Sequence, residues 1–334
     1  MKDAIEELFD NVSKPFEMAR AMPPSVYTSE AFLKEELEHI FKKDWYCVGR
    51  ASALANVGDY VTLDLAEQPI IVLRDRSGII RAMSNVCRHR MSTLLDGRGN
   101  TTSIVCPYHA WTYSLDGSLR GAPAMTQNAG FCRGDYALPT VRCEEWLGWV
   151  FITLNNDAKP VAQELAGVEA HIGDYNMTGY VEKFRETHVW DTNWKVLAEN
   201  FMESYHLPVC HAGTIGGLSK LEEMVCPPGE AAFNYHTILK DDTLRIALAH
   251  PANKVLEGER RRMTYLLAIY PSLLITLTPG YFWYLSLHPK GVRQVQITFG
   301  GGMSLEYMDD NDAQDKFRYL KTLLDDVNVE DRGC

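Results

Sequence analysis

Short runs of aliphatic, aromatic and β-branched residues follow one another from Trp45 to about residue 154, and they predict a small antiparallel β domain. The runs cover residues 45–49, 59–63, 70–73, 79–83 and 149–154. Turn-forming stretches separate them, among them Asn56-Val57-Gly58 and Asp75-Arg76-Ser77-Gly78. Short strands at this spacing are typical of compact β domains. We therefore assign residues 43–157 to one antiparallel β domain.

The hydrophobic period then changes, which predicts a second, α+β domain over residues 158–334. Residues 1–42 predict an N-terminal helical segment that packs on this domain and is interrupted at Met22-Pro23-Pro24. Helices are predicted at 161–176, 193–206 and 309–327, and strands at 183–190, 232–239, 243–249, 263–269, 272–278, 282–288 and 292–299. A long antiparallel sheet covered by helices has the α+β architecture.

Composition narrows the class of protein. The chain has 334 residues, of which 46% are apolar and 23% charged, as in an ordinary globular protein. A net charge of −11 argues against nucleic-acid binding, which needs a basic face. The eight cysteines are scattered, without the density of a disulfide framework. Without a signal-peptide core or an apolar run of eighteen residues, the chain is expected to be cytoplasmic.

Two short loops in the β domain each offer one thiolate and one imidazole. Cys87 and His89 lie in the first loop, and Cys106 and His109 in the second. In a Rieske [2Fe–2S] cluster, two cysteines hold one iron and two histidines hold the other. A Cys₂His₂ zinc site is the alternative, although zinc-finger spacing usually places both cysteines before both histidines. The alternating order favours the Rieske cluster.

A second set of metal-binding residues lies in the predicted helix at 193–206. On a continuous helix Glu199, Glu203 and His206 share one face, and Pro208 would break the helix so that His211 returns beside His206. Two imidazoles with one carboxylate form the facial triad of non-haem Fe(II) oxygenases. The carboxylate could come from Asp331, after the last predicted helix, or from the start of that helix at Asp309, Asp310 or Asp312.

These motifs resemble those of the Rieske non-haem iron oxygenases, the aromatic-ring-hydroxylating dioxygenase α-subunit family. The resembling segments are CRHR, CPYHAW and Asn200–His211, together with Glu330-Asp331, and the likeness extends nearly end to end. It implies a helix-grip catalytic domain, here shortened at its C-terminus, with His206, His211 and Asp331 as ligands of a mononuclear Fe(II). It also implies catalytic roles for Asn200 and Glu203.

The same resemblance implies partners and a reaction. Because no Gly-x-Gly-x-x-Gly motif follows a strand, electrons from NADH are expected through a separate reductase or ferredoxin. The family forms head-to-tail homotrimers, in which Glu203 of one chain would bridge to His109 of its neighbour. The expected reaction is oxygenation of a small organic substrate by O₂.

The segment NFMESYHLPVCH is most similar to the carnitine, betaine and stachydrine oxygenases, which favours oxidative demethylation of a quaternary amine. Ring hydroxylation or cis-dihydroxylation of an aromatic acid is the alternative, and a Rieske electron-transfer protein without oxygenase activity is the rival from another class. Five aromatic residues lie on strands expected to line the substrate cavity, where they could enclose an aromatic ring or a quaternary ammonium group, although most of them are expected to be ordinary sheet core: Tyr235, Tyr270, Phe282, Trp283 and Tyr284.

Overall fold

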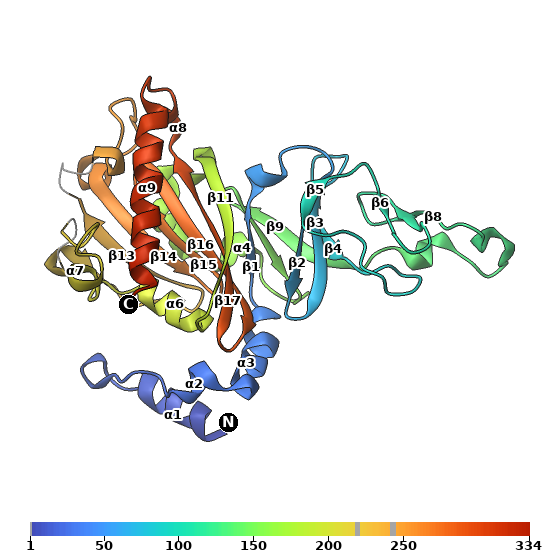
Figure 1. The fold of residues 1–334 in the computed structure, drawn as a ribbon, viewed down its shortest axis with the longest axis horizontal. Coiled ribbons are helices and arrows are strands. Elements are labelled where there is room, and N and C mark those ends of the chain that lie inside the picture. The colour runs from blue at the N-terminus through green and yellow to red at the C-terminus, as the bar shows by residue number, and fades with distance from the viewer. Residues whose placement is uncertain (1, 218–220, 241–244) are drawn as a thin grey trace. The chain divides into compact units, whose positions relative to one another are not determined.

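The computed structural model describes residues 2–217, 221–240 and 245–334. They form two compact units, one of residues 37–163 and one that combines residues 1–36 with 164–334 (Figure 1). Both units are rich in antiparallel sheet, and the second adds helices, so the predicted α+β class is confirmed. The domain limits at residues 42/43 and 157/158 remain predictions.

The unit of residues 37–163 contains a seven-stranded antiparallel sheet in the order β1-β10-β9-β4-β3-β2-β5 and a small sheet in the order β6-β7-β8. Its strands are β1 Tyr46–Arg50, β2 Asp59–Leu65, β3 Gln68–Arg74, β4 Ile80–Ser84, β5 Arg98–Asn100, β6 Ile104–Val105, β7 Thr112–Tyr113, β8 Leu119–Gly121, β9 Thr140–Trp146 and β10 Trp149–Thr153. A buried core that includes Ile71, Leu73 and Met83 extends to Cys87 and Cys106. The two predicted cluster loops therefore rest on the core of this unit.

The other unit is built on a second seven-stranded antiparallel sheet, in the order β11-β17-β16-β15-β14-β13-β12. Its strands are β11 Val181–Trp190, β12 Met224–Val225, β13 Phe233–Leu239, β14 Met263–Ile269, β15 Leu273–Leu277, β16 Tyr281–Gly291 and β17 Gln294–Met303. The helices of the chain are α1 Lys2–Val12, α2 Ser25–Thr28, α3 Glu30–Glu36, α4 Val161–Glu164, α5 Ala166–Ile172, α6 Trp194–Phe201, α7 Leu207–Cys210, α8 Leu305–Met308 and α9 Ala313–Asp331.

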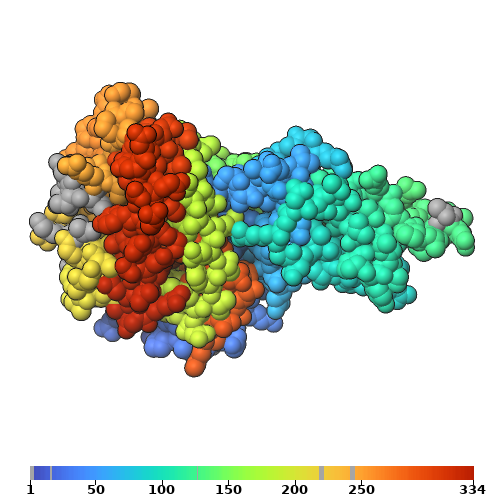
Figure 2. All heavy atoms as spheres, turned by 45° about the horizontal axis from the view of Figure 1, so that its top comes forward, coloured from blue at the N-terminus to red at the C-terminus, as the bar shows by residue number. Residues whose placement is uncertain are grey.

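Helix α9 lies across one face of this sheet (Figure 1). Its buried residues Leu320, Leu324 and Val327 recur at helical spacing, which gives the helix one apolar side against the sheet. The opposite side of α9 is exposed, and its C-terminal end lies beside the yellow segment that contains α7 (Figure 2). Because α9 packs in this way, the C-terminal residues lie beside the loop between α6 and α7.

Three predicted elements differ from the structure. Helix α6 ends at Phe201 rather than 206, because the carboxylate of Glu203 accepts the backbone N–H groups of Tyr205 and His206 and so competes with helix continuation. The predicted strand 243–249 is wrong over Arg245–Ala247, which form a 3₁₀ turn, and its first residues lie outside the described ranges. The last helix is displaced: it starts at Ala313 and continues through Asp331.

A buried ion pair joins the N-terminal segment to α6. The Nζ of Lys195 lies 2.8 Å from a carboxylate oxygen of Glu36, and both side chains are less than a tenth exposed. Burial raises the pKa of the Glu36 carboxyl and lowers that of the Lys195 ammonium, and each partner opposes the effect of burial on the other. Each charge is therefore tolerated inside the protein only because the other is present.

We predict that Lys195→Met lowers the free energy of unfolding by about 3 kcal/mol, because it leaves a buried carboxylate unpaired. The double variant Glu36→Gln with Lys195→Met should lose less, since neither charge then remains. Urea unfolding measures both. Lys14→Met, which removes the partially exposed pair with Asp10, serves as the control and should cost less than about 1 kcal/mol. An equal loss in the single and double variants would contradict the argument.

Among the described residues, no helix is long and apolar enough to cross a membrane.

Candidate active site and metal centres

The two loops that carry Cys87 and Cys106 close in the same way. The carbonyl of Cys87 accepts the N–H of Met91, and the carbonyl of Cys106 accepts the N–H of Ala110. Met91 and Ala110 both have positive φ, near 55°, a conformation that turns the backbone sharply at the end of each loop. Both turns therefore close four residues after the cysteine, and the histidine of each loop lies within the turn.

The side chains of these loops meet as a cluster requires. Cys87 and Cys106 are buried free thiols, and the rings of His89 and His109 lie 4.8 Å apart between centroids. Burial opposes ionisation of Cys106, but N–H groups of Tyr108 and His109 outweigh it and lower the pKa of the thiol. A thiolate is the form that binds iron. The residues present therefore fit a [2Fe–2S] cluster with two sulfur and two nitrogen ligands.

His206 and His211 lie at the two ends of the short helix α7. His206 precedes its first residue and His211 follows its last. Pro208 lies in the first turn of this helix, where a missing N–H costs no hydrogen bond, so it starts a helix rather than breaking one. The two imidazole centroids are 5.1 Å apart. The histidines are thus paired as predicted, but the end of the helix that allows the pairing lies at Met202, the C-cap of α6, and not at Pro208.

Asp331 reaches the same point from the last turn of α9, not from beyond the helix as predicted. Its Oδ1 lies 3.1 Å from Nε2 of His211 and 3.9 Å from Nε2 of His206. Among the described residues, these three side chains form the one group of histidine, cysteine or acidic residues spaced to hold a single metal ion, with ligand atoms within 4.8 Å of one another. Asp310 and Asp312 instead pair with Lys316.

The carboxylate of Asp331 fits a metal ligand. Burial raises the pKa of this carboxyl, and the two histidines oppose the rise. Its Oδ1 is buried without a hydrogen-bond partner, a state that is costly unless a cation is bound there. Two imidazole nitrogens and one carboxylate oxygen are the ligands typical of a non-haem Fe(II) that keeps open positions.

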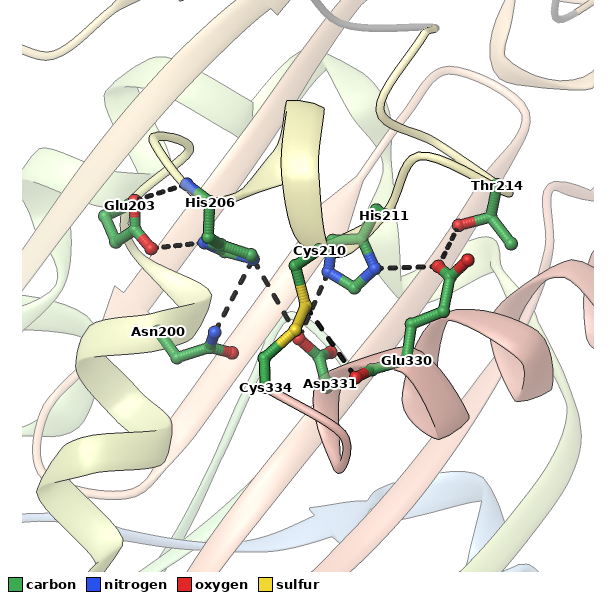
Figure 3. The surroundings of a disulfide bond; sticks show 9 residues. All are labelled: Asn200, Glu203, His206, Cys210, His211, Thr214, Glu330, Asp331 and Cys334. Atoms are coloured by element: carbon green, nitrogen blue, oxygen red, sulfur yellow. Dashed lines mark hydrogen bonds and ion pairs between the residues drawn. A yellow bond between two sulfur atoms is a disulfide. The ribbon is translucent and has the colours of Figure 1, made fainter.

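Two glutamates contact the histidine rings on the Nδ1 side, away from Asp331 (Figure 3). Glu203 contacts Nδ1 of His206. Glu330 lies 2.9 Å from Nδ1 of His211 and accepts the hydroxyl of Thr214. Hydrogen bonds, first from Thr214 and then from His211, lower the pKa of Glu330. In both rings the Nε2 atom is left to face Asp331, which is the orientation that a metal ligand needs.

The sequence analysis missed the role of Glu330, since only its neighbour Asp331 was considered as a ligand. The signal lay in the helical register: once α9 continues to Asp331, adjacent residues point about 100° apart. Asp331 then faces the histidine pair while Glu330 reaches the outer side of His211. The amide of Asn200 lies 3.5 Å from Nε2 of His206, which brings this predicted residue to the group as well.

A disulfide between Cys210 and Cys334 joins α7 to the residues that follow α9 (Figure 3). Cys210 is the neighbour of His211, so the bond links the two segments that supply the three clustered side chains. The sequence did not suggest this pairing, because the two cysteines are 124 residues apart.

A cavity opens beside the three side chains, and the empty space in the cavity and at its mouth is about 980 Å³. Aromatic residues line part of it: Trp190, Phe201, Tyr281 and Trp283. Of the five aromatics predicted for this cavity, Trp283 lines it. Its neighbours Phe282 and Tyr284 are fully buried on the other face of β16, and the ring of Tyr235 lies against His171. Tyr270 is also outside the lining.

Comparison with known proteins identifies the family of both units. Residues 44–142 match the Rieske [2Fe–2S] domain, and residues 177–334 match the catalytic domain of the ring-hydroxylating α subunit. The chain belongs to the Rieske non-haem iron oxygenases. The predicted family, fold class and pair of cofactors, a Rieske cluster and a mononuclear iron, are confirmed at this level.

Several characterised members of this family are similar to the chain. The carnitine monooxygenase oxygenase subunit of Escherichia coli K12 is 36% identical over 198 residues, or 58% of this chain and 53% of the relative. The putrescine 2-hydroxylase of Ralstonia nicotianae is 29% identical over 93% of this chain and 85% of the relative. A crystal structure of a quaternary ammonium Rieske monooxygenase with L-carnitine superimposes with a TM-score of 0.76 and 25% identity, over 93% of this chain and 82% of the other. The chain spans little more than half the length of the carnitine monooxygenase subunit.

We predict that Glu330→Gln weakens iron binding to the second unit about ten- to a hundredfold, because His211 loses the carboxylate that orients its ring and raises its basicity. Iron retained after dialysis against a graded series of chelator concentrations measures the effect, with the spectrum of the [2Fe–2S] cluster as an internal reference.

Asp326→Asn is the matched control, since it removes an exposed carboxylate from the same helix. Unchanged iron retention in Glu330→Gln would show that Glu330 does not support the metal centre.

Proposed function

We propose that this protein is the terminal oxygenase component of a Rieske non-haem iron system. The observation that supports it most directly is the cluster of His206, His211 and Asp331, which borders a cavity large enough for a small organic substrate. In this proposal Cys87, His89, Cys106 and His109 hold the [2Fe–2S] cluster. An Fe(II) bound by the other three residues would supply O₂ activation for insertion of oxygen into the substrate.

The protein's own side chains position the ligands and the substrate. Glu203 and Glu330 fix the ring orientations of His206 and His211, so that both Nε2 atoms point to the same place. Asn200 contributes an amide beside His206. The aromatic and aliphatic lining keeps bulk water from the substrate, which protects a reactive centre from side reactions.

We further propose a methylated quaternary amine as the substrate and oxidative demethylation as the reaction. The similarity to the carnitine and glycine betaine monooxygenase oxygenase subunits supports this choice. The rings of Phe201, the residue after Asn200, and Trp283 pack edge to face with their centroids 5.2 Å apart. Aromatic faces attract quaternary ammonium groups. Hydroxylation of an aromatic acid is the second candidate, since the same rings could enclose an aromatic ring and the fold is shared with naphthalene 1,2-dioxygenase.

Electrons are proposed to come from NADH through a separate reductase or ferredoxin. Transfer from cluster to iron is proposed to cross between chains of a head-to-tail homotrimer, with Glu203 joining His206 to His109 of the next chain. The exposed surface around Glu203 supports this: Tyr205 and Val209 are each 84% exposed, so apolar area beside Glu203 is available to a neighbouring chain.

The first test is analytical. The purified protein should contain about three irons and two labile sulfides per chain, and with NADH and a reductase it should couple O₂ uptake to release of formaldehyde from a methylated amine. His206→Ala or His211→Ala should abolish turnover and leave the cluster spectrum intact. Zinc without labile sulfide would contradict the proposal, and an intact cluster that never supports O₂ uptake would favour a plain electron carrier.

The second test concerns Glu203. Glu203→Gln keeps the size of the side chain but removes the charge that holds the imidazole of His206. It should retain both metal centres and the oligomer, yet slow reoxidation of the reduced cluster with substrate and O₂ present by at least about a hundredfold, read as the return of cluster absorbance in a single turnover. Glu222→Gln, an exposed acid outside the ligand loop, is the control. Reoxidation at the wild-type rate would exclude Glu203 as the bridge.

A further inference from the structure

The cavity beside the metal-binding cluster has a polar region that the proposed chemistry does not use. Thr264, on β14, lines the cavity and is 2% exposed, and its hydroxyl is buried without a hydrogen-bond partner. A buried hydroxyl without a partner costs free energy, so native proteins rarely retain one unless a ligand or a water bonds to it. This atom therefore marks a place where a ligand can gain a hydrogen bond.

Two more polar side chains line the cavity near Thr264. Lys240 follows the end of β13, and Thr276 lies on β15. In the antiparallel register Thr264 lies opposite Ile238, and Ile238 is two residues before Lys240, so Thr264 and Lys240 are on the same face. Thr276 lies opposite Leu266, which is two residues after Thr264 and therefore also on that face. Lys240, Thr264 and Thr276 therefore share one face of three adjacent strands. We call them the polar subsite.

The polar subsite suits an anion. An ammonium carries three N–H donors, so it can serve more than one acceptor, and the hydroxyls add directional donors. A carboxylate can accept from the ammonium and from a hydroxyl at once, which makes charge-assisted hydrogen bonds of the stronger kind. A second ammonium group, as in a diamine, would instead face the like charge of Lys240.

The register also sets the distance to the aromatic part of the cavity. Trp283 on β16 lies directly opposite Thr276, which in turn lies opposite Leu266 on the strand of Thr264. Two strand spacings of about 4.8 Å therefore separate the strand of Trp283 from that of Thr264, roughly 10 Å in total. A ligand that reaches both needs several bonds between its ammonium and its anionic group.

We propose that Lys240 and Thr264 bind the carboxylate of a zwitterionic substrate whose methylated ammonium lies against Trp283 and Phe201. This inference rests on the proposed function and names the substrate class: acids in which a chain of several bonds separates a trimethylammonium group from a carboxylate. The polar subsite then selects the substrate by its far end, while the metal-binding residues act on the methyl groups.

Binding is tested by titration calorimetry of the anaerobic protein with gamma-butyrobetaine and with its alcohol analogue, in which CH₂OH replaces the carboxylate. The wild type should bind the acid more tightly than the alcohol. Thr264→Val and Lys240→Met should each weaken binding of the acid by about tenfold or more, the range for a hydrogen bond to a charged group. Binding of the alcohol should change by less than about threefold in Lys240→Met, since it carries no charge there.

Two further variants separate a specific role from damage to the fold. Thr264→Ser keeps the hydroxyl and should restore binding of the acid to within about threefold of the wild type. Thr237→Val removes a hydroxyl from the other face of β13, away from the polar subsite, and should leave binding unchanged.

The outcomes distinguish this inference from the proposed function. Equal affinity of the wild type for acid and alcohol, or equal losses for both in Lys240→Met, would overturn the polar subsite and leave the proposed function intact. Tighter binding of putrescine than of gamma-butyrobetaine would also overturn the polar subsite. Binding of neither trimethylammonium compound would overturn the proposed substrate and, with it, this inference.

Discussion

The structure of the second unit depends on one costly feature, the buried carboxylate of Asp331 between two imidazoles. Desolvation raises the pKa of this group, and the buried oxygen has no hydrogen-bond partner, so the carboxylate is stable as an anion only beside positive charge. The neighbouring histidines oppose the rise in the pKa of Asp331, and a bound cation would stabilise the anion further. The fold must therefore hold the end of α9 in a narrowly defined position beside the loop after α6.

The surrounding packing accounts for that precision. The apolar side of α9 fixes its axial position on the sheet through Leu320, Leu324 and Val327. Glu330 and Thr214 connect the last turn of the helix to the segment after α7, and the Cys210–Cys334 bond connects the same two segments covalently. The buried ion pair of Glu36 and Lys195 fixes α6 to the N-terminal segment, and the end of α6 determines the position of His206. Together these contacts restrict both segments that supply the ligand set.

What could be predicted from the sequence was mainly local. The cysteine and histidine loops and the histidine pair were recognisable because their spacing is short and chemically specific, and most strands followed from alternation. The end of α6 was missed because the side chain of Glu203 competes for backbone N–H groups, which a helical periodicity does not register. The disulfide, the role of Glu330 and the cavity lining were missed because they depend on contacts between residues far apart in the chain.

The two metal centres solve different electrostatic problems. In the first unit, backbone N–H groups favour the thiolate of Cys106 while the loop leaves His109 exposed, so a cluster held there has an accessible edge for electron exchange. In the second, His211 is 1% exposed, the side chains of His206 and Asp331 are partly buried, and a largely apolar cavity opens beside the three. A charged substrate loses hydration when it enters a weakly polar cavity, so it binds only if groups in the cavity offset the free energy of desolvation. The faces of the aromatic rings can stabilise an ammonium group in part, but they repel a carboxylate. In the proposed polar subsite Lys240 and Thr264 stabilise the carboxylate, so the choice of substrate depends on the sheet as much as on the metal-binding residues.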